Sequence, residues 1–250
     1  MILHPKKTMH NKQADREVRL PLRSEMTPRL LTAASFVRSG ATVADVGTDH
    51  AYLPIYLVSA GIANCAIASD INEGPLARAE ANVHKYDLRD RIALRLTPGL
   101  AGIEACAPTD ILICGMGGEL IASILEAATF VRDPKIRLIL QPMSSARELR
   151  LWLAENGFEI VEERFAAEKE KLYVVMCAHY KGVPYPLSEI DSYIGSGVAD
   201  PLFGEWIRRQ IIAVSKQVNG LAKAGREDPA LNALLQGLQE RLDGYERSKQ

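Results

Sequence analysis

The sequence predicts an α/β protein, with a doubly wound sheet of seven strands followed by an antiparallel two-helix coiled coil. Short apolar runs alternate with helical patterns over residues 42–156, as in successive β-α units. The last two apolar runs have no helix between them, so they should form an antiparallel pair at the sheet edge. After Pro184 and Pro186 the apolar residues follow a 4-3-4-3 spacing, which is typical of packed helices.

The first expected helix begins at Thr27 and Pro28, a capping hydroxyl followed by proline at the first helical position, and should end at Gly40. The expected strands cover residues 42–46, 65–70, 92–96, 110–114, 136–140, 158–165 and 171–178. The expected helices between them cover residues 51–60, 72–86, 118–128 and 145–156.

The C-terminal segment carries two apolar stripes joined by a short polar turn. Asp228 and Pro229 begin the second of the two helices. The stripes consist of Ile207, Ile211, Val214, Val218 and Leu221, and then Leu231, Leu235, Leu238, Leu242 and Tyr245. Such stripes predict an antiparallel hairpin. A hairpin that packs on the protein or forms a dimer explains the pattern, and a hairpin that contacts RNA explains it equally well. The sequence does not give the oligomeric state.

Composition excludes several classes of protein. The chain is 47% hydrophobic and 24% charged, as in ordinary globular proteins. Its longest apolar run, Ile111 to Leu125, is shorter than a membrane span and contains Glu119. Residues 1–17 lack the apolar core of a secretory signal. The four cysteines are scattered, which predicts a cytoplasmic protein with reduced thiols and no metal site.

The net charge of −1 argues against indiscriminate binding of nucleic acid, but the N-terminal part is basic. Residues 1–38 contain eight lysines and arginines, Arg23 and Arg29 among them, against three acidic residues. Such an arm beside a ligand pocket could contact phosphates, whereas the simpler interpretation is a solvated tail.

A glycine crowded by acidic residues follows the first expected strand. Asp45, Gly47 and Asp49 lie in this loop, and Asp70 ends the next strand. The glycine allows close approach of a ligand, and the second carboxylate can accept hydrogen bonds from a ribose diol. Carboxylates here would repel a pyrophosphate but suit a cationic ligand that carries an amino group. The pattern therefore favours S-adenosylmethionine over NAD.

Two further segments offer groups for an acceptor. The turn from Gly115 to Gly118 lacks a side-chain acceptor and leaves room for a flat group, although a tight turn into a helix would also explain it. Gln141 ends the fifth strand, where its amide could read the edge of a base, and Pro142 would hold the turn. Capping of the following helix is an alternative explanation for Asp49.

The motifs Asp45-Val-Gly-Thr-Asp-His-Ala-Tyr-Leu-Pro54, Gly115-Met-Gly-Gly118, Leu138-Ile-Leu-Gln-Pro142 and Tyr193-Ile-Gly195 resemble those of the bacterial tRNA adenine-22 N1-methyltransferase family. The resemblance covers roughly residues 20–222. It implies a Rossmann-like methyltransferase domain, here over residues 25–182, and a C-terminal coiled-coil domain, here the helical hairpin over 183–250. It further implies S-adenosylmethionine as methyl donor and N1 of a tRNA adenine as acceptor. The composition of residues 1–24 separately predicts a flexible basic segment.

These observations lead to three groups of expected site residues. The expected catalytic residues are Asp49, His50 and Tyr52. The expected cofactor-binding residues are Asp45, Gly47, Asp70, Ile71, Gly99, Leu100, Gly115 and Met116. The expected substrate-binding residues are Gly117, Gly118, Gln141, Pro142, Arg23 and Arg29.

The chain departs from the family at two positions. Pro98 stands where the family usually has an acidic residue placed to bind the adenine amine of the cofactor, and Met143 stands where it usually has asparagine. Two other functions stay open. One is a small-molecule methyltransferase on the same fold, which would not need the basic arm and the hairpin. The other is an RNA-binding adaptor that has lost the cofactor, which the substitution at Pro98 makes plausible.

Overall fold

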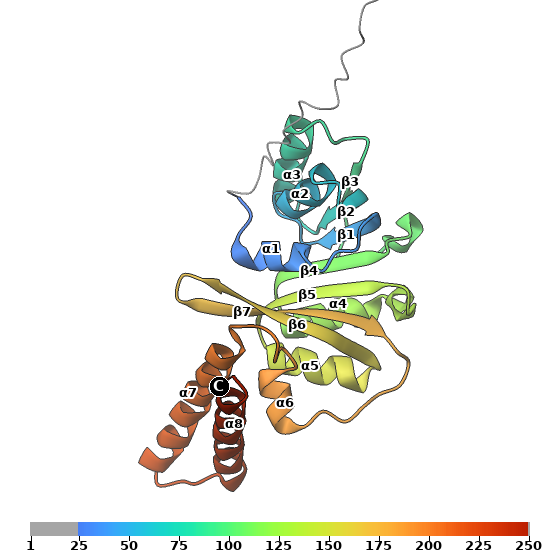
Figure 1. Cartoon of the computed structure of the whole chain (residues 1–250). Coiled ribbons are helices and arrows are strands. Elements are labelled where there is room, and N and C mark those ends of the chain that lie inside the picture. The colour runs from blue at the N-terminus through green and yellow to red at the C-terminus, as the bar shows by residue number, and fades with distance from the viewer. Residues whose placement is uncertain (1–24, 250) are drawn as a thin grey trace, which may run out of the picture.

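A seven-stranded sheet forms the centre of the molecule in the computed structural model, which describes residues 25–249 (Figure 1). The expected basic segment 1–24, with Arg23, lies outside the described residues. The strand order is β3-β2-β1-β4-β5-β7-β6, and β7 runs antiparallel to both of its neighbours. The strands are β1 (Ala41–Val46), β2 (Ala63–Asp70), β3 (Ile92–Leu96), β4 (Asp110–Gly117), β5 (Arg137–Ser144), β6 (Phe158–Glu168) and β7 (Lys171–Tyr180). The expected doubly wound sheet is confirmed.

Helices cover both faces of this sheet (Figure 1). They are α1 (Pro28–Ala34), α2 (Tyr52–Ser59), α3 (Glu73–Lys85), α4 (Gly118–Ala127), α5 (Ala146–Glu155), α6 (Glu189–Ile194), α7 (Phe203–Lys223) and α8 (Pro229–Arg247). Two short 3-10 helices, η1 (Glu104–Cys106) and η2 (Thr129–Arg132), lie in the connections. Residues of α1, α2 and α3 pack into one apolar cluster, and residues of α4 and α5 pack into the other.

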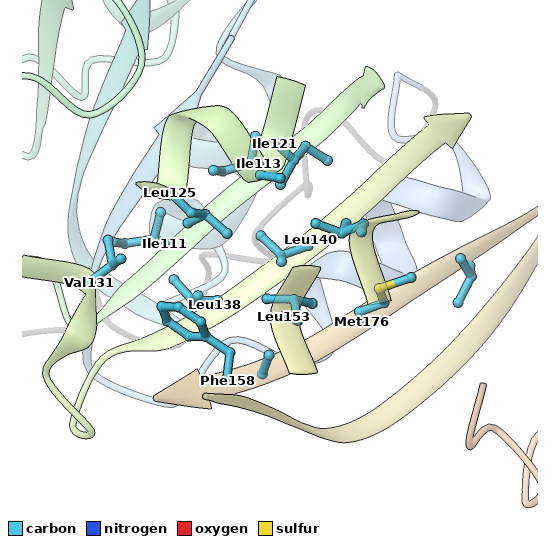
Figure 2. Close-up of a cluster of buried hydrophobic side chains, with 14 of the residues drawn as sticks. Ile111, Ile113, Ile121, Leu125, Val131, Leu138, Leu140, Leu153, Phe158 and Met176 are labelled. Carbon is cyan, nitrogen blue, oxygen red and sulfur yellow. The ribbon is translucent and has the colours of Figure 1, made fainter. Parts of the chain in front are cut away.

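Alternation along the central strands produces these two clusters. Ile111 and Ile113 of β4 face α4, where they meet Ile121 and Leu125 (Figure 2). Leu112, between them, belongs to the cluster on the opposite face. Strand β4 is therefore buried on both faces, as its continuous apolar run Ile111–Ile113 requires. Burial of each such side chain contributes roughly 1.5–3 kcal/mol relative to exposure.

The first helix is shorter than the sequence predicts. It ends at Ala34 rather than Gly40, because the Ser35 amide donates to the carbonyls of both Leu31 and Thr32 and tightens the last turn. Phe36 and Val37 follow the helix and are buried in the cluster on this face. Their apolar character reflects this burial and not a continued helix.

Strand β4 is longer than expected, and this changes the start of the next helix. The strand passes through Gly115 and Met116 and ends at Gly117, with register shifts against β5. Gly115 adopts a φ of 86°, which favours glycine. The expected turn over residues 115–118 is therefore an irregular strand end, and α4 begins directly after it.

The two C-terminal helices pack against each other as a hairpin (Figure 1). The Asp228 side chain accepts hydrogen bonds from the amides of Ala230 and Leu231, so it caps α8 as the sequence indicates. Val214 of α7 and Leu238 of α8 are fully buried and belong to the same apolar cluster as α4 and α5. The hairpin therefore shares a continuous core with the sheet, while supercoiling of the pair stays a prediction.

A buried ion pair ties α6, the helix that precedes the hairpin, to α5 and the sheet. The Arg150 Nε donates to Glu163 Oε1 at 2.8 Å, and both side chains are almost inaccessible. Arg150 also donates to the carbonyls of Ser192 and Tyr193 in α6. A Cβ on Gly195 would collide with the Glu163 carboxylate, so this position requires glycine. Within residues 25–249, no helix has the length and apolarity to cross a membrane.

Candidate active site

The candidate site lies at the ends of β1, β2 and β4, near the middle of the sheet. Strand β1 pairs with β2 on one side and with β4 on the other. The order in which the chain adds strands to the sheet therefore reverses between β1 and β4. Loops at such a switch point diverge and leave a crevice at the carboxyl ends of the strands. Two adjoining cavities occupy this edge, and the wall between them is formed by Gly47, Cys114 and Gly115.

The larger cavity has a volume of about 1000 Å³. Asp70 and Ile71 follow β2 in its lining, and Leu120 and Ile124 of α4 form an apolar wall. The expected cofactor-binding residues that line it are Gly47, Asp70, Ile71, Gly99, Leu100, Gly115 and Met116. This cavity has the size and the largely apolar character of a small-molecule site.

Gly47 gives this cavity its shape through both its backbone and its missing side chain. Its φ is 76°, in the region that favours glycine. A Cβ at this position would collide with the terminal methyl group of Met116. The amides of Gly47 and Thr48 both donate to the Ser69 carbonyl, which ties the loop to the end of β2.

Asp70 is placed to bind a polar ligand group. Its carboxylate is buried, and Oδ1 accepts the Asn72 amide at 2.9 Å. Because Asp70 lines the larger cavity, its remaining oxygen can accept hydrogen bonds there. Ile71, next to it, is 66% exposed and offers an apolar surface at the cavity edge.

The smaller cavity, of about 370 Å³, lies on the other side of the shared wall. All three expected catalytic residues line it, together with Asp45 and Arg29. Asp45 was expected to bind the cofactor, and the structure places it on this side of the wall. Three carboxylates, those of Glu25, Asp45 and Asp49, make the cavity predominantly acidic.

Asp45 is a buried acid without a cationic partner in the described part of the chain. Its Oδ2 accepts a hydrogen bond from the Thr48 hydroxyl at 2.6 Å. Burial is the main reason why the pKa of Asp45 is raised to about 6. The hydrogen bond from Thr48 lowers this pKa, whereas the negative charge of Asp70 raises it. Burial and the neighbouring Asp45 also raise the pKa of the Cys114 thiol, which stays protonated.

Asp49 precedes the helix without capping it. Helix α2 begins only at Tyr52, and Asp49 has a φ of 45°, which is unusual for a residue other than glycine. Its carboxylate pairs with Arg78 of α3 at 2.8 Å. The rings of His50 and Tyr52 are stacked at 5.0 Å with an interplanar angle of 6°, so they form a flat surface beside the carboxylate.

Gln141 lies beneath the shared wall rather than in a cavity. It is fully buried, and its Oε1 accepts hydrogen bonds from Arg29 Nη1 at 2.9 Å and from the Gly115 amide at 3.1 Å. Its Nε2 donates to the Pro142 carbonyl. Both ends of the amide are thus bonded within the protein, which favours a positioning role over base reading.

Three further residues that were expected to bind substrate also line neither cavity. Gly118 packs so closely on the Ser145 carbonyl that a Cβ would collide with it, and Gly117 contacts Ser144. Pro142 is buried and pairs with Met116 across β4 and β5. Arg29 is the expected substrate-binding residue that lines the smaller cavity.

Sequence reasoning missed several lining residues. Leu120 and Ile124 lie one helical turn apart on α4, and Leu120 is 53% exposed although it is large and apolar. An apolar residue outside the buried stripe of an amphipathic helix is the signal that could have revealed this wall. Glu104 and Thr48 carried no recognisable pattern. Among residues 25–249, no three His, Cys, Asp or Glu side chains cluster as metal ligands.

Comparisons with known proteins agree with this architecture. The family model described as "Methyltransferase domain" matches residues 26–176. The tRNA (adenine(22)-N(1))-methyltransferase of Bacillus subtilis is 41% identical over 154 residues, which are 62% of this chain and 65% of that enzyme. The chain thus spans just under two thirds of this curated relative.

Solved structures extend the similarity to nearly the whole chain. The crystal structure of the B. subtilis m1A22 tRNA methyltransferase TrmK has 30% identity and a TM-score of 0.70, covering 88% of this chain and 97% of that one. The chain belongs to the m1A22 tRNA methyltransferase family. A second member of this family, from Streptococcus pneumoniae, was crystallised with S-adenosyl-L-methionine. It has 35% identity and a TM-score of 0.76, covering 87% of this chain and 99% of that one.

Membership of the m1A22 methyltransferase family confirms the resemblance seen in the sequence and the expected Rossmann-like fold. The family model ends at residue 176, within β7, so it describes the sheet and its covering helices without the hairpin. Both cavities are built by residues inside this matched region, except for Glu25 at the rim of the smaller one.

Proposed function

We propose that this protein transfers a methyl group from S-adenosylmethionine to N1 of an adenine in tRNA, at position 22. The observation that carries the proposal is the pair of adjoining cavities, which share the lining residues Gly47, Cys114 and Gly115. Direct transfer requires a donor and an acceptor whose reacting atoms approach to roughly 3–3.5 Å. Glycines at two of the three wall positions permit such an approach.

The residues around the larger cavity fit S-adenosylmethionine. Asp70 would accept the ribose hydroxyls, and Ile71, Leu100 and Ile124 would enclose the flat adenine ring. Gly47 and Gly115 would let the methionine part lie against the backbone. When bound, the cofactor supplies an electrophilic methyl group on a positively charged sulfur. The acidic Asp45 beyond the wall favours this positive charge.

The smaller cavity would hold the adenine. The stacked rings of His50 and Tyr52 offer a surface for a base, and base stacking on aromatic side chains contributes about 1–3 kcal/mol. A base in a folded tRNA must leave its stack to reach this cavity. The N1 lone pair of adenine can then attack the methyl group without a covalent enzyme intermediate.

Asp49 would stabilise the product, because N1-methylation leaves the adenine ring cationic. Its carboxylate could alternatively take a proton from the exocyclic amine. The ion pair with Arg78 partly neutralises Asp49, and the Asp49 side chain is 59% exposed. Covering of Asp49 by the RNA would strengthen its interaction with the developing charge, since the surrounding dielectric falls.

Gln141 would act as a positioning residue for both cavities. It connects Arg29 of the smaller cavity with Gly115 of the wall through one oxygen atom. We assign Gly117, Gly118 and Pro142 to the same supporting layer, because their neighbours are protein atoms of β5 and the start of α5.

The wider partner would be the tRNA backbone, and the protein would act in the cytoplasm. Within α7 and the turn after it, residues 203–226 contain five basic residues and one acidic residue. Arg209, Lys216 and Lys223 recur at intervals of seven and lie opposite the side packed on α8. This distribution favours RNA contact by the hairpin over dimerisation alone.

The test is incubation of the protein with S-adenosylmethionine and a tRNA transcript, followed by mass spectrometry of the nucleosides. We expect 1-methyladenosine from a transcript with adenine at position 22 and none from the same transcript with guanine there. Methylation of free adenosine at a comparable rate would instead support a small-molecule methyltransferase. Absence of methylation together with absence of cofactor binding would support an adaptor.

A further inference from the structure

The strand order divides the larger cavity into three regions. Its inner end lies at Gly47 and Gly115, after β1 and β4. Asp70, after β2, comes next, and the loop after β3 lies beyond it, because the sheet order is β3-β2-β1-β4. A ligand with its reactive sulfur at the shared wall and its ribose at Asp70 must therefore extend its base toward the loop over residues 97–104.

This loop offers few polar groups to a base. The Thr97 hydroxyl donates to the Ala101 carbonyl at 2.9 Å, and the Thr97 amide donates to the Asp70 carbonyl. Pro98 has neither an amide hydrogen nor a polar side chain. Leu100 is buried and apolar. The loop over residues 97–103 thus encloses the base region mainly with apolar and already bonded groups.

Glu104 differs from these residues. It begins the 3-10 helix η1 directly after the loop, it is exposed, and it is one of the residues that line the larger cavity. Asp70 is the other carboxylate in the lining. Within the described part of the chain, the Glu104 carboxylate has no ion pair or hydrogen bond, whereas Asp70 accepts the Asn72 amide. The Glu104 carboxylate is therefore an acceptor without a protein partner at the outer end of the cavity.

We propose that Glu104 accepts a hydrogen bond from the exocyclic 6-amino group of the cofactor's adenine. The inference rests on the proposed function for the identity of the methyl donor, but it does not depend on the RNA substrate. In S-adenosylmethionine the 6-amino group is the donor at the end of the base far from the sulfur. A carboxylate suits it because charge-assisted hydrogen bonds are stronger than neutral ones. Glu104 would thus make the cavity select adenine over a 6-oxo purine.

Isothermal titration calorimetry with two ligands tests this assignment. The ligands are S-adenosylhomocysteine and S-inosylhomocysteine, which carries an oxygen in place of the 6-amino group. We expect the wild type to bind S-adenosylhomocysteine about 10-fold more tightly than S-inosylhomocysteine. Glu104→Ala should lose affinity for S-adenosylhomocysteine alone, so that it binds the two compounds equally. Glu104→Gln should reduce or reverse the preference, because its amide can donate to the 6-oxo group.

Glu126→Ala is the matched control, since Glu126 is an exposed acid on α4 outside the cavity lining. It should leave both affinities unchanged. If Glu104→Ala retains the wild-type preference, or loses affinity for both ligands equally, the proposal is wrong. The donor assignment would survive either result, and only failure of the wild type to bind S-adenosylhomocysteine at all would overturn both.

A second variant tests the location of the contact. Pro98→Asp in the Glu104→Ala background places a carboxylate in the loop directly before residue 104. Recovery of the preference for the adenosyl compound would support a 6-amino group facing this loop. An unchanged lack of preference in a double variant with wild-type melting temperature would place the base elsewhere in the cavity and overturn the proposal.

Discussion

Arg29 and Gln141, which are far apart in the sequence, are joined by a hydrogen bond of 2.9 Å between Nη1 and Oε1. The same oxygen accepts the Gly115 amide, and Arg29 also pairs with Glu168 on β6. One buried amide thus connects the first helix, the shared wall and the edge of the sheet. This connection explains how the wall between the two cavities is held although two of its three residues are glycines.

Replacement of Gln141 should therefore impair catalysis more than it impairs folding. In Gln141→Leu, the Gly115 amide and the Arg29 guanidinium lose their acceptor, which costs about 1–3 kcal/mol of stability. We expect the kcat for tRNA methylation to fall at least about 10-fold, because small displacements of reacting groups reduce rates strongly. Gln210→Leu, on α7, is the control. A normal kcat in Gln141→Leu would contradict the positioning role.

Asp45 should make stability depend on pH. Burial raises its pKa from 3.8 to about 6, so the folded protein binds this proton more tightly than the unfolded chain. The resulting stabilisation is complete below about pH 4 and is lost as the pH rises through 6. At pH 8, the free energy of unfolding of Asp45→Asn should therefore exceed that of the wild type by up to about 3 kcal/mol, and the variant should unfold at a higher urea concentration. Near pH 4 the two proteins should unfold at similar urea concentrations. Asp90→Asn, at an exposed position, should show no such difference.

The same ionisation should affect the methyl donor more than the demethylated product. Below pH 6, Asp45 becomes protonated and no longer favours a positive sulfur. Affinity for S-adenosylmethionine should then decline relative to that for S-adenosylhomocysteine, whose sulfur is neutral. Calorimetry between pH 5 and 8 measures this ratio. In Asp45→Asn the ratio should stay constant, and a persistent pH dependence there would assign the effect to another group.

Asp49→Asn tests the proposed stabilisation of the cationic product. Asparagine tolerates the positive φ of this position, so the fold and the melting temperature should be retained. Loss of the charge should abolish methylation of tRNA while leaving S-adenosylhomocysteine binding close to normal. Arg78→Ala, which frees the Asp49 carboxylate, should retain activity. Undiminished turnover in Asp49→Asn would remove the role assigned to this residue.

Gly47→Ala should weaken cofactor binding for two separable reasons. The positive φ costs roughly 1–3 kcal/mol for a residue with a side chain, and the added methyl group meets the end of Met116. Met116→Ala in the same background removes the collision but not the strain. We expect this double variant to recover part of the affinity, as measured by calorimetry. No recovery would show that backbone strain accounts for the whole effect.

Much of the sheet could be predicted because its signals are local. The strands from β1 to β5 are short, mainly apolar runs, and glycines such as Gly61 and Gly157 mark the ends of helices that follow them. The exceptions have tertiary causes. Helix α1 ends early because Phe36 turns into the core, and β4 continues past Gly115 because β5 pairs with it.

The cavity residues show the same division. Asp70 and Gly47 were recognised because they end consecutive strands, and strand ends meet at one edge of a parallel sheet. Glu104, Leu120 and Ile124 approach the cavity from separate segments, and no spacing in the sequence relates them. Gln141 was expected to face the cleft because its amide could read the edge of a base. In the structure it is buried beneath the wall shared by the two cavities, where its oxygen binds Arg29 and the Gly115 amide.

The sequence by itself determined the order of strands and helices, the acidic glycine loop and the family, because these depend on residue types at short separations. Tertiary structure alone decided that Asp45 faces the smaller cavity, that Gln141 supports the wall and that the hairpin shares the core of the sheet. Such relationships depend on which buried groups find partners once distant segments pack together, and only the folded chain brings those groups within a few ångströms of each other.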